Sequence, residues 1–178
     1  MAHSPPPLRF SARKARSPKL ELAFRVVQRF VSRRKQSLAW TRLILNCPEI
    51  VRFRKYNQGK PGLRALMHTF HEKNAICALS VAGQLADGFV IGLFLHEFGH
   101  LGSGGGEREA DRWILDNFGI RIQYVGELDL EWVDDWVIRR ILREATPLLR
   151  NPRPALAGRR LHRSPPRRLR ATPSGRRP

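Results

Sequence analysis

Two histidines and a glutamate near the middle of the chain have the types and spacing that metal-dependent hydrolysis needs. His96 and His100 are four residues apart, and Glu97 directly follows the first of them. On an α-helix, positions i and i+4 lie on the same face, so both imidazoles can bind one ion. A catalytic zinc site adds one more protein ligand and a water, whose proton the adjacent glutamate can accept. We therefore predict that His96 and His100 bind Zn²⁺ and that Glu97 is the general base.

An acidic segment that begins seven residues after His100 offers the third ligand. Glu107 and Asp111 are four residues apart and share one helix face, whereas Glu109 points elsewhere. We predict that Glu107 is the third zinc ligand and that Asp111 accepts the second ring N–H of a ligand histidine, which fixes its tautomer. Glu109 fits instead a solvated helix start, where negative charge is favourable to the helix dipole.

Together the two segments resemble the gluzincin zinc peptidases. The run Glu-Arg-Glu-Ala-Asp-Arg at residues 107–112 is similar to the second motif helix of the ImmA/IrrE-like metallopeptidases, and the resemblance covers about residues 65–120. It implies a zinc metalloendopeptidase with the roles given above for His96, Glu97, His100, Glu107 and Asp111. It also implies a protein or peptide substrate, for which a transcriptional repressor is one candidate by analogy with that family.

The elements that must position these residues can be predicted from the pattern around them. Residues 89–95 are apolar almost all round, which indicates a central buried helix over residues 88–101, capped by Asp87. A buried strand over residues 74–81 and a turn at 83–86 precede it. This strand fits either the edge of the cleft, where a peptide substrate could add to it, or the core of the sheet. The glycine-rich residues 102–106 reverse the chain, and a second helix runs from Glu107 to near Gly119.

Further elements are expected downstream, and the fold class is α+β. Residues 120–125 alternate like a short strand, and residues 131–149 form an amphipathic helix. We expect a small sheet packed on the central motif helix, followed by the Glu/Asp-bearing helix and further helices. His68, His71 and Tyr124 could donate a hydrogen bond to an oxyanion, although each of these residue types is more often structural.

The charge of the chain lies at its ends. The net charge is +18, of which residues 1–35 and 151–178 contribute +9 each, while residues 36–150 are formally neutral. We expect a disordered basic N-terminus over 1–18, one metallopeptidase-like domain over 19–150, and a disordered Arg/Pro-rich tail over 151–178. The domain begins with a basic amphipathic helix, which is expected to pack on it.

The alternative function is a non-catalytic, zinc-containing module whose basic ends bind nucleic acid non-specifically.

The cysteines and the longest apolar stretch bear on location. Cys47 and Cys77 are thirty residues apart and fit buried or free thiols in a reducing compartment, so we expect a cytoplasmic protein. Residues 75–95 are long and apolar enough to cross a membrane. Gln84 and Asp87 fall in the middle of this stretch, and a central Asp costs roughly 2.5–3.5 kcal/mol on insertion scales. We therefore expect no membrane span.

Overall fold

The computed structural model describes residues 16–51, 66–126 and 129–150 and has an α+β fold, as predicted. The helices are α1 (Pro18–Val31), α3 (Asp87–Ser103), α4 (Glu107–Phe118) and α5 (Asp135–Arg150), with 3₁₀ turns η1 (Gln36–Trp40) and η2 (Ser80–Gln84). The strands are β1 (Arg42–Leu45), β2 (Met67–Phe70), β3 (Ala75–Ala78), β4 (Gln123–Val125) and β5 (Leu130–Trp132). The predicted tail 151–178 and most of the predicted N-terminal segment lie outside the described residues.

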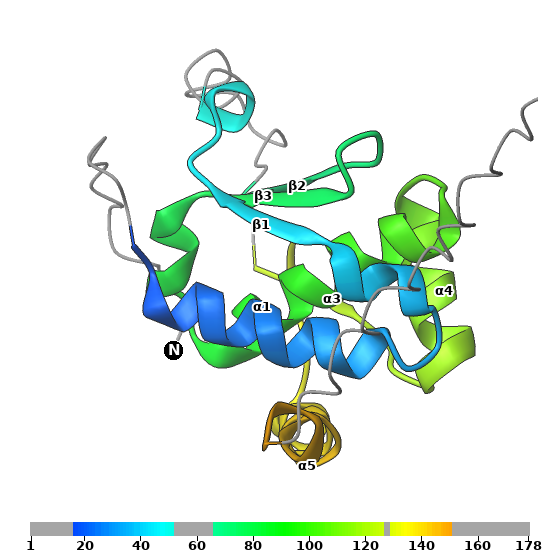
Figure 1. The fold of residues 1–178 in the computed structure, drawn as a ribbon. Coiled ribbons are helices and arrows are strands. Elements are labelled where there is room, and N and C mark those ends of the chain that lie inside the picture. The colour runs from blue at the N-terminus through cyan, green and yellow to red at the C-terminus, as the bar shows by residue number, and fades with distance from the viewer. Residues whose placement is uncertain (1–15, 52–65, 127–128, 151–178) are drawn as a thin grey trace, which may run out of the picture.

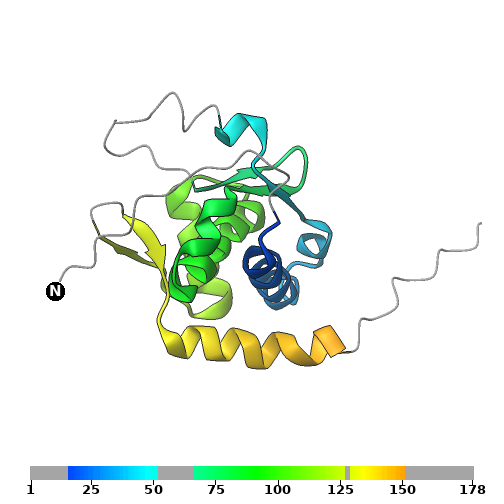
Figure 2. The ribbon, with the colours of Figure 1, turned by 90° about the vertical axis from the view of Figure 1, so that its left-hand side faces the viewer.

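Helix α3 lies among the other elements, in contact with α1, α4, α5, β2 and β5 (Figure 1). In Figure 2 the three-stranded sheet lies above α3, α5 lies below it, and α1 and the β4–β5 hairpin lie on opposite sides of it. Nearly all residues of α3 are buried. Because α3 is apolar on all sides, it must be covered on all sides, and the surrounding elements cover it.

The two ends of α3 are held by charged side chains of the α1 region. Asp87 is the first residue of the helix and makes no capping bond, so the prediction that it is the N-cap was wrong. Its carboxylate instead lies 2.8 Å from Lys19 Nζ. At the other end, Lys35 Nζ donates to the carbonyls of Leu101 and Gly102 at 3.2 and 2.7 Å. Cations favour a helix C-terminus, where carbonyl groups lack intrahelical partners.

The first sheet has the order β1–β3–β2, with β1 parallel and β2 antiparallel to β3. The strand predicted over residues 74–81 is shorter in the structure, where β3 spans Ala75–Ala78, because the chain enters η2 at Ser80. It is also the central strand, with a partner on each side, so the sheet-core alternative is confirmed and the cleft-edge alternative was wrong. The strand that lies at the edge next to α3 is β2.

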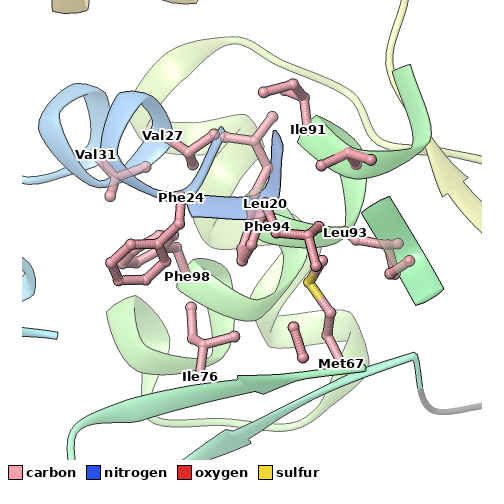
Figure 3. Packing of buried hydrophobic residues seen from close by; sticks show 14 of the residues in the cluster. Leu20, Phe24, Val27, Val31, Met67, Ile76, Ile91, Leu93, Phe94 and Phe98 are labelled. Atoms are coloured by element: carbon pink, nitrogen blue, oxygen red, sulfur yellow. The ribbon is translucent and has the colours of Figure 1, made fainter. Parts of the chain in front are cut away.

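Helix α1 packs its apolar face on α3 and α5, as the amphipathic pattern predicted. Phe24 contacts Phe94 and Phe98, with ring centroids 5.7 and 5.5 Å apart. Figure 3 shows these rings between α1 and the sheet, from which Met67 and Ile76 extend toward them. The core is thus continuous from α1 through α3 to the sheet.

The segment after α4 differs from the prediction at its start. Glu131 and Trp132 belong to β5, which pairs with β4 in a hairpin, and α5 begins only at Asp135. The predicted helix therefore began four residues too early. Trp132 was predicted to lie on the apolar face of that helix, but it belongs to β5 and packs against Phe89 of α3, with ring centroids 4.7 Å apart. Helix α5 buries Val137 and Ile141.

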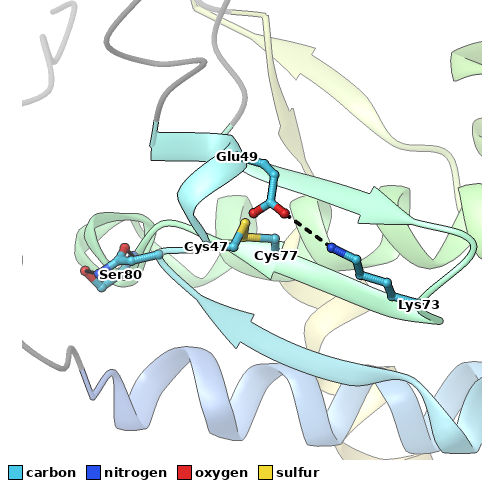
Figure 4. Close-up of a disulfide and its surroundings, with 6 residues drawn as sticks. Cys47, Glu49, Lys73, Cys77 and Ser80 are labelled. Atoms are coloured by element: carbon cyan, nitrogen blue, oxygen red, sulfur yellow. Dashed lines mark hydrogen bonds and ion pairs between the residues drawn. A yellow bond between two sulfur atoms is a disulfide. The ribbon is translucent and has the colours of Figure 1, made fainter.

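Cys47 and Cys77 form a disulfide that links the chain after β1 to β3 (Figure 4). Both residues are buried, as predicted, but the prediction of thiols was wrong. The strand pairing explains the bridge. Because β1 runs parallel to β3 with Ile44 opposite Cys77, Cys47 follows three residues later and lies within reach of Cys77.

No helix among the described residues has both the length and the apolar character needed to cross a membrane.

Candidate metal centre

Three side chains from α3 and α4 converge on one point. The Nε2 atoms of His96 and His100 are 3.1 Å apart, and Glu107 Oε2 lies 2.7 Å from the first and 3.6 Å from the second. All three residues belong to one group whose ligand atoms lie within 4.8 Å of one another. These are the three residues predicted as zinc ligands.

The separations fit a small tetrahedral cation. With zinc–ligand bonds of 2.0–2.1 Å, neighbouring ligand atoms of a tetrahedral site are about 3.3 Å apart. The three observed separations lie on both sides of this value. The His96 side chain is 3 % exposed and that of Glu107 is 79 % exposed, so the group opens to solvent on the Glu107 side. An ion held here would keep a position for water or substrate.

Each histidine uses its other ring nitrogen in a second interaction. His96 Nδ1 lies 2.8 Å from Asp111 Oδ1, and His100 Nδ1 lies 3.0 Å from the Gly105 carbonyl. Both acceptors favour a proton on Nδ1, so Nε2 of each ring is the atom that faces Glu107 and would bind an ion. Orientation of this kind is typical of metal-binding histidines. Asp111 therefore occupies the place that the sequence predicted for it.

In the absence of an ion, the acids around His96 favour its protonated form. Burial lowers the pKa of His96, but the hydrogen bond to Asp111 and the charges of Glu131, Glu97 and Asp111 outweigh this effect and raise the pKa to about 9. A divalent cation would take the place of that proton. The surroundings thus favour positive charge at this position.

Glu97 is buried beside the histidines and is held by β2. Thr69 Oγ1 donates to Glu97 Oε2 at 2.6 Å and also lies 3.0 Å from the Glu97 carbonyl oxygen. Burial raises the pKa of Glu97, and the Thr69 bond opposes this rise. The sequence analysis did not identify Thr69, because nothing local to residue 69 shows that its strand lies against the motif helix.

Close backbone approach along one side of α3 brings its neighbours to the histidines. A Cβ atom on Gly99 would lie 2.5 Å from the Ala110 carbonyl oxygen of α4, and one on Gly92 would lie 2.6 Å from the Glu131 carbonyl oxygen of β5. Only residues without a side chain allow such contacts. Gly104, in the left-handed region at φ 73°, ends α3 so that α4 can begin at Glu107.

Glu109 does not join the group. It lies in the first turn of α4, exposed to solvent, and its side chain is directed toward Gly105 and Gly106. The structure thus brings Glu107 and not Glu109 to the histidines. Asp111 follows on the same face of α4, as the four-residue spacing predicted.

The three candidate oxyanion donors have different surroundings. His68 is on β2, and burial and the nearby charges of His100 and His71 lower its pKa. His71 lies in the turn after β2. The Tyr124 hydroxyl donates to Asp111 Oδ2 at 2.7 Å, so it is engaged with the group that orients His96.

Glu131 is a further acid near the metal group that the sequence analysis placed in a helix. It lies opposite Tyr124 in the β4–β5 register and is half-buried. Burial raises the pKa of Glu131, and the charge of His96 opposes this rise. The β4–β5 pairing brings it to this position.

Comparisons of the chain with protein-family models, with curated proteins and with solved structures found no match. The resemblance to the gluzincins therefore depends on the motif residues alone, and the chemistry of the group must be argued from its own geometry.

Proposed function

We propose that this protein is a zinc-dependent metallopeptidase of the gluzincin type. The observation that supports it best is the convergence of His96, His100 and Glu107, with each histidine oriented through its other nitrogen. Two imidazoles and a carboxylate are a common ligand set of catalytic zinc. A purely structural zinc site would be closed by a fourth protein ligand, and no fourth ligand belongs to the group among the described residues.

Glu97 is the general base of the proposed reaction. Zinc, when bound, polarises the scissile carbonyl and lowers the pKa of a water molecule. Glu97 accepts a proton from that water and later delivers it to the leaving amine. Burial raises the pKa of this carboxyl, which favours its acceptance of a proton. Thr69 keeps the carboxylate in place during both steps.

The substrate is proposed to be an extended peptide that lies along β2. This strand has a sheet partner on one side only among the described strands, and its Thr69 contacts Glu97. An extended segment can add to such an edge through main-chain hydrogen bonds. By resemblance to the ImmA/IrrE-like enzymes, we further propose a regulatory protease that cleaves a specific protein, with a transcriptional repressor as one candidate.

The test combines metal analysis with one substitution. We expect one zinc per chain in the purified protein and cleavage in a mixed peptide library. Glu97→Gln should keep the zinc and lose cleavage, because an amide cannot accept the proton of the water. Cleavage by the zinc-loaded Glu97→Gln protein would refute the mechanism. A wild-type chain that holds no zinc would refute the metal centre.

The alternative is a zinc-containing module without catalysis that binds nucleic acid through its basic ends. Those ends lie mostly outside the described residues, and the argument for them is their charge. Glu97 favours catalysis, since a scaffold requires the histidines but not a base beside them. Binding to DNA that falls steeply with salt and disappears on deletion of residues 151–178 would support the alternative.

The cytoplasmic location remains a prediction. Its argument from free cysteines is lost, because Cys47 and Cys77 form a disulfide. Disulfides are typical of oxidising compartments and uncommon in the cytosol.

A further inference from the structure

Tyr124, in the middle of β4, is connected to the metal group through one carboxylate. Its hydroxyl donates to Asp111 Oδ2 at 2.7 Å, and Asp111 Oδ1 lies 2.8 Å from His96 Nδ1. The two oxygens of Asp111 therefore have different partners. A direct approach of the hydroxyl to His96 Nδ1 is longer, at 3.4 Å. The two shorter hydrogen bonds thus connect Tyr124 to the imidazole through Asp111.

The hairpin that carries Tyr124 is fixed to the helix that carries His96. The β5 backbone at Glu131 lies against Gly92, and the Trp132 ring covers Gly88, where an added Cβ would lie 2.5 Å from the ring. The Val133 N–H also donates to the Gly88 carbonyl at 3.2 Å. Because β4 is paired with β5, Tyr124 is held at a fixed position relative to α3, while Asp111 comes from α4.

From this arrangement we propose that Tyr124 is a positioning residue of the metal centre and acts through Asp111. The inference rests on the proposed metal site. A carboxylate with one bonded oxygen can rotate, and its histidine can then turn or change tautomer. With both oxygens bonded, Asp111 keeps an acceptor at His96 Nδ1 and so keeps the Nε2 lone pair toward Glu107 and His100. Partners of this kind tune metal affinity without touching the metal.

The exposure of Tyr124 separates this role from packing. The residue is 45 % exposed, so its ring contributes little to the core, and its ring plane lies at 84° to that of His96 with centroids 6.4 Å apart. Tyr124→Phe removes the hydroxyl and keeps the ring. The substitution should therefore change the metal centre with little effect on folding.

A double-mutant cycle on the full chain tests the proposal. Zinc affinity is measured by competition with a chromophoric chelator for the wild type, Tyr124→Phe, Asp111→Ala and the double variant. Outer partners of ligand histidines typically contribute 10–100-fold in affinity. Tyr124 is one step further out, so we expect a loss of about three- to tenfold for Tyr124→Phe alone, and no further loss when it is added to Asp111→Ala.

Controls separate the outcomes. Val125→Ala changes an exposed neighbour in the same strand and should bind zinc as the wild type does. In the zinc-loaded protein, the ¹⁵Nδ1 and Nδ1–H shifts of His96 should change in Tyr124→Phe, because the hydrogen bond from Nδ1 to Asp111 is altered. Two results would overturn the role of Tyr124 and leave the metal centre intact. One is an equal loss of zinc affinity when Tyr124→Phe is made in the wild type and in Asp111→Ala. The other is a wild type that binds zinc tightly and a Tyr124→Phe variant that binds it equally well. Absence of zinc binding by the wild type would overturn both.

Discussion

Gly99 on α3 and Ala110 on α4 bring the two motif helices into backbone contact. A Cβ atom on Gly99 would lie 2.5 Å from the Ala110 carbonyl oxygen, and Ala110 is fully buried. Glu107 precedes Ala110 by less than one turn, and His96 and His100 lie on either side of Gly99. The distance between the two helices therefore determines whether the three candidate ligands can meet.

We expect Gly99→Ala to destabilise the protein and weaken zinc binding. Alanine in a helix is better than glycine by about 1 kcal/mol, so an uncrowded site would be stabilised. Here the methyl group must move a backbone segment, which typically costs about 1–3 kcal/mol and displaces Glu107 from the histidines. Urea unfolding and zinc content after dialysis measure both effects. Ala110→Gly adds no atom to the same contact and should keep its zinc, whereas a more stable, zinc-replete Gly99→Ala protein would contradict the argument.

Glu144 on α5 forms a pH-dependent ion pair with Arg33, which lies in the turn after α1. Its carboxylate accepts from Arg33 at 2.5 Å and from Arg140 at 2.9 Å. Burial raises the pKa of Glu144, but the bonds and charges of Arg140 and Arg33 outweigh this and lower the pKa below its ordinary 4.5. A lowered folded-state pKa contributes stability above pH 4.5 that is lost as the pH falls through the folded value.

Glu144→Gln should accordingly cost about 1 kcal/mol of unfolding free energy at pH 7, since the pair is partly exposed. The difference from the wild type should shrink as the pH falls from 4.5 through the lowered folded-state pKa, below which both proteins carry a neutral group at this position. Urea titrations at several pH values measure it. Glu21→Gln, at an exposed acid of α1, is the matched control, and a difference that persists in acid would contradict the assignment.

The parts of the site that the sequence predicted are those that local spacing determines. His96 and His100 face the same way because they are four residues apart on one helix, and the same holds for Glu107 and Asp111. Thr69 could not be found in this way, because its contact with Glu97 depends on which strand lies at the sheet edge. Spacing along the chain carries no information on strand order.

The errors at Asp87 and Glu131 have a similar origin. Asp87 has the residue type of an N-cap, but the nearby Lys19 of α1 offers its carboxylate an ion pair. Glu131 has a helical pattern around it, but pairing with β4 extends the chain there. In each case a partner distant in sequence determined the local structure, as tertiary context commonly does.

The Cys47–Cys77 disulfide should be detectable by thiol counting. Without reductant, the denatured chain should contain no free thiol, and after reduction it should contain two. The bridge joins residues 30 apart, and closing a loop of that length stabilises a fold by about 3–4 kcal/mol. Cys47→Ala with Cys77→Ala should lower the melting temperature accordingly and keep zinc, because the ligands belong to α3 and α4. Two free thiols before reduction would show that the bridge does not form.

The choice between Glu107 and Glu109 is the sharpest test of the metal centre. The two residues are separated by roughly 200° around α4, so only one can face the histidines. Glu107 Oε2 lies 2.7 Å from His96 Nε2, whereas the Glu109 side chain is directed toward Gly105 and Gly106.

We therefore expect Glu107→Ala to lose most of its zinc on dialysis and Glu109→Ala to keep it. The pair is well matched, because both acids are exposed, lie in the first turn of α4 and change the charge by the same amount. An effect through the helix dipole would be about 0.3–1 kcal/mol and similar for both variants. Loss of a ligand affects only one of them. The reverse pattern would assign the third ligand to Glu109 and require α4 to be rotated about its axis, which the Gly99–Ala110 contact does not allow.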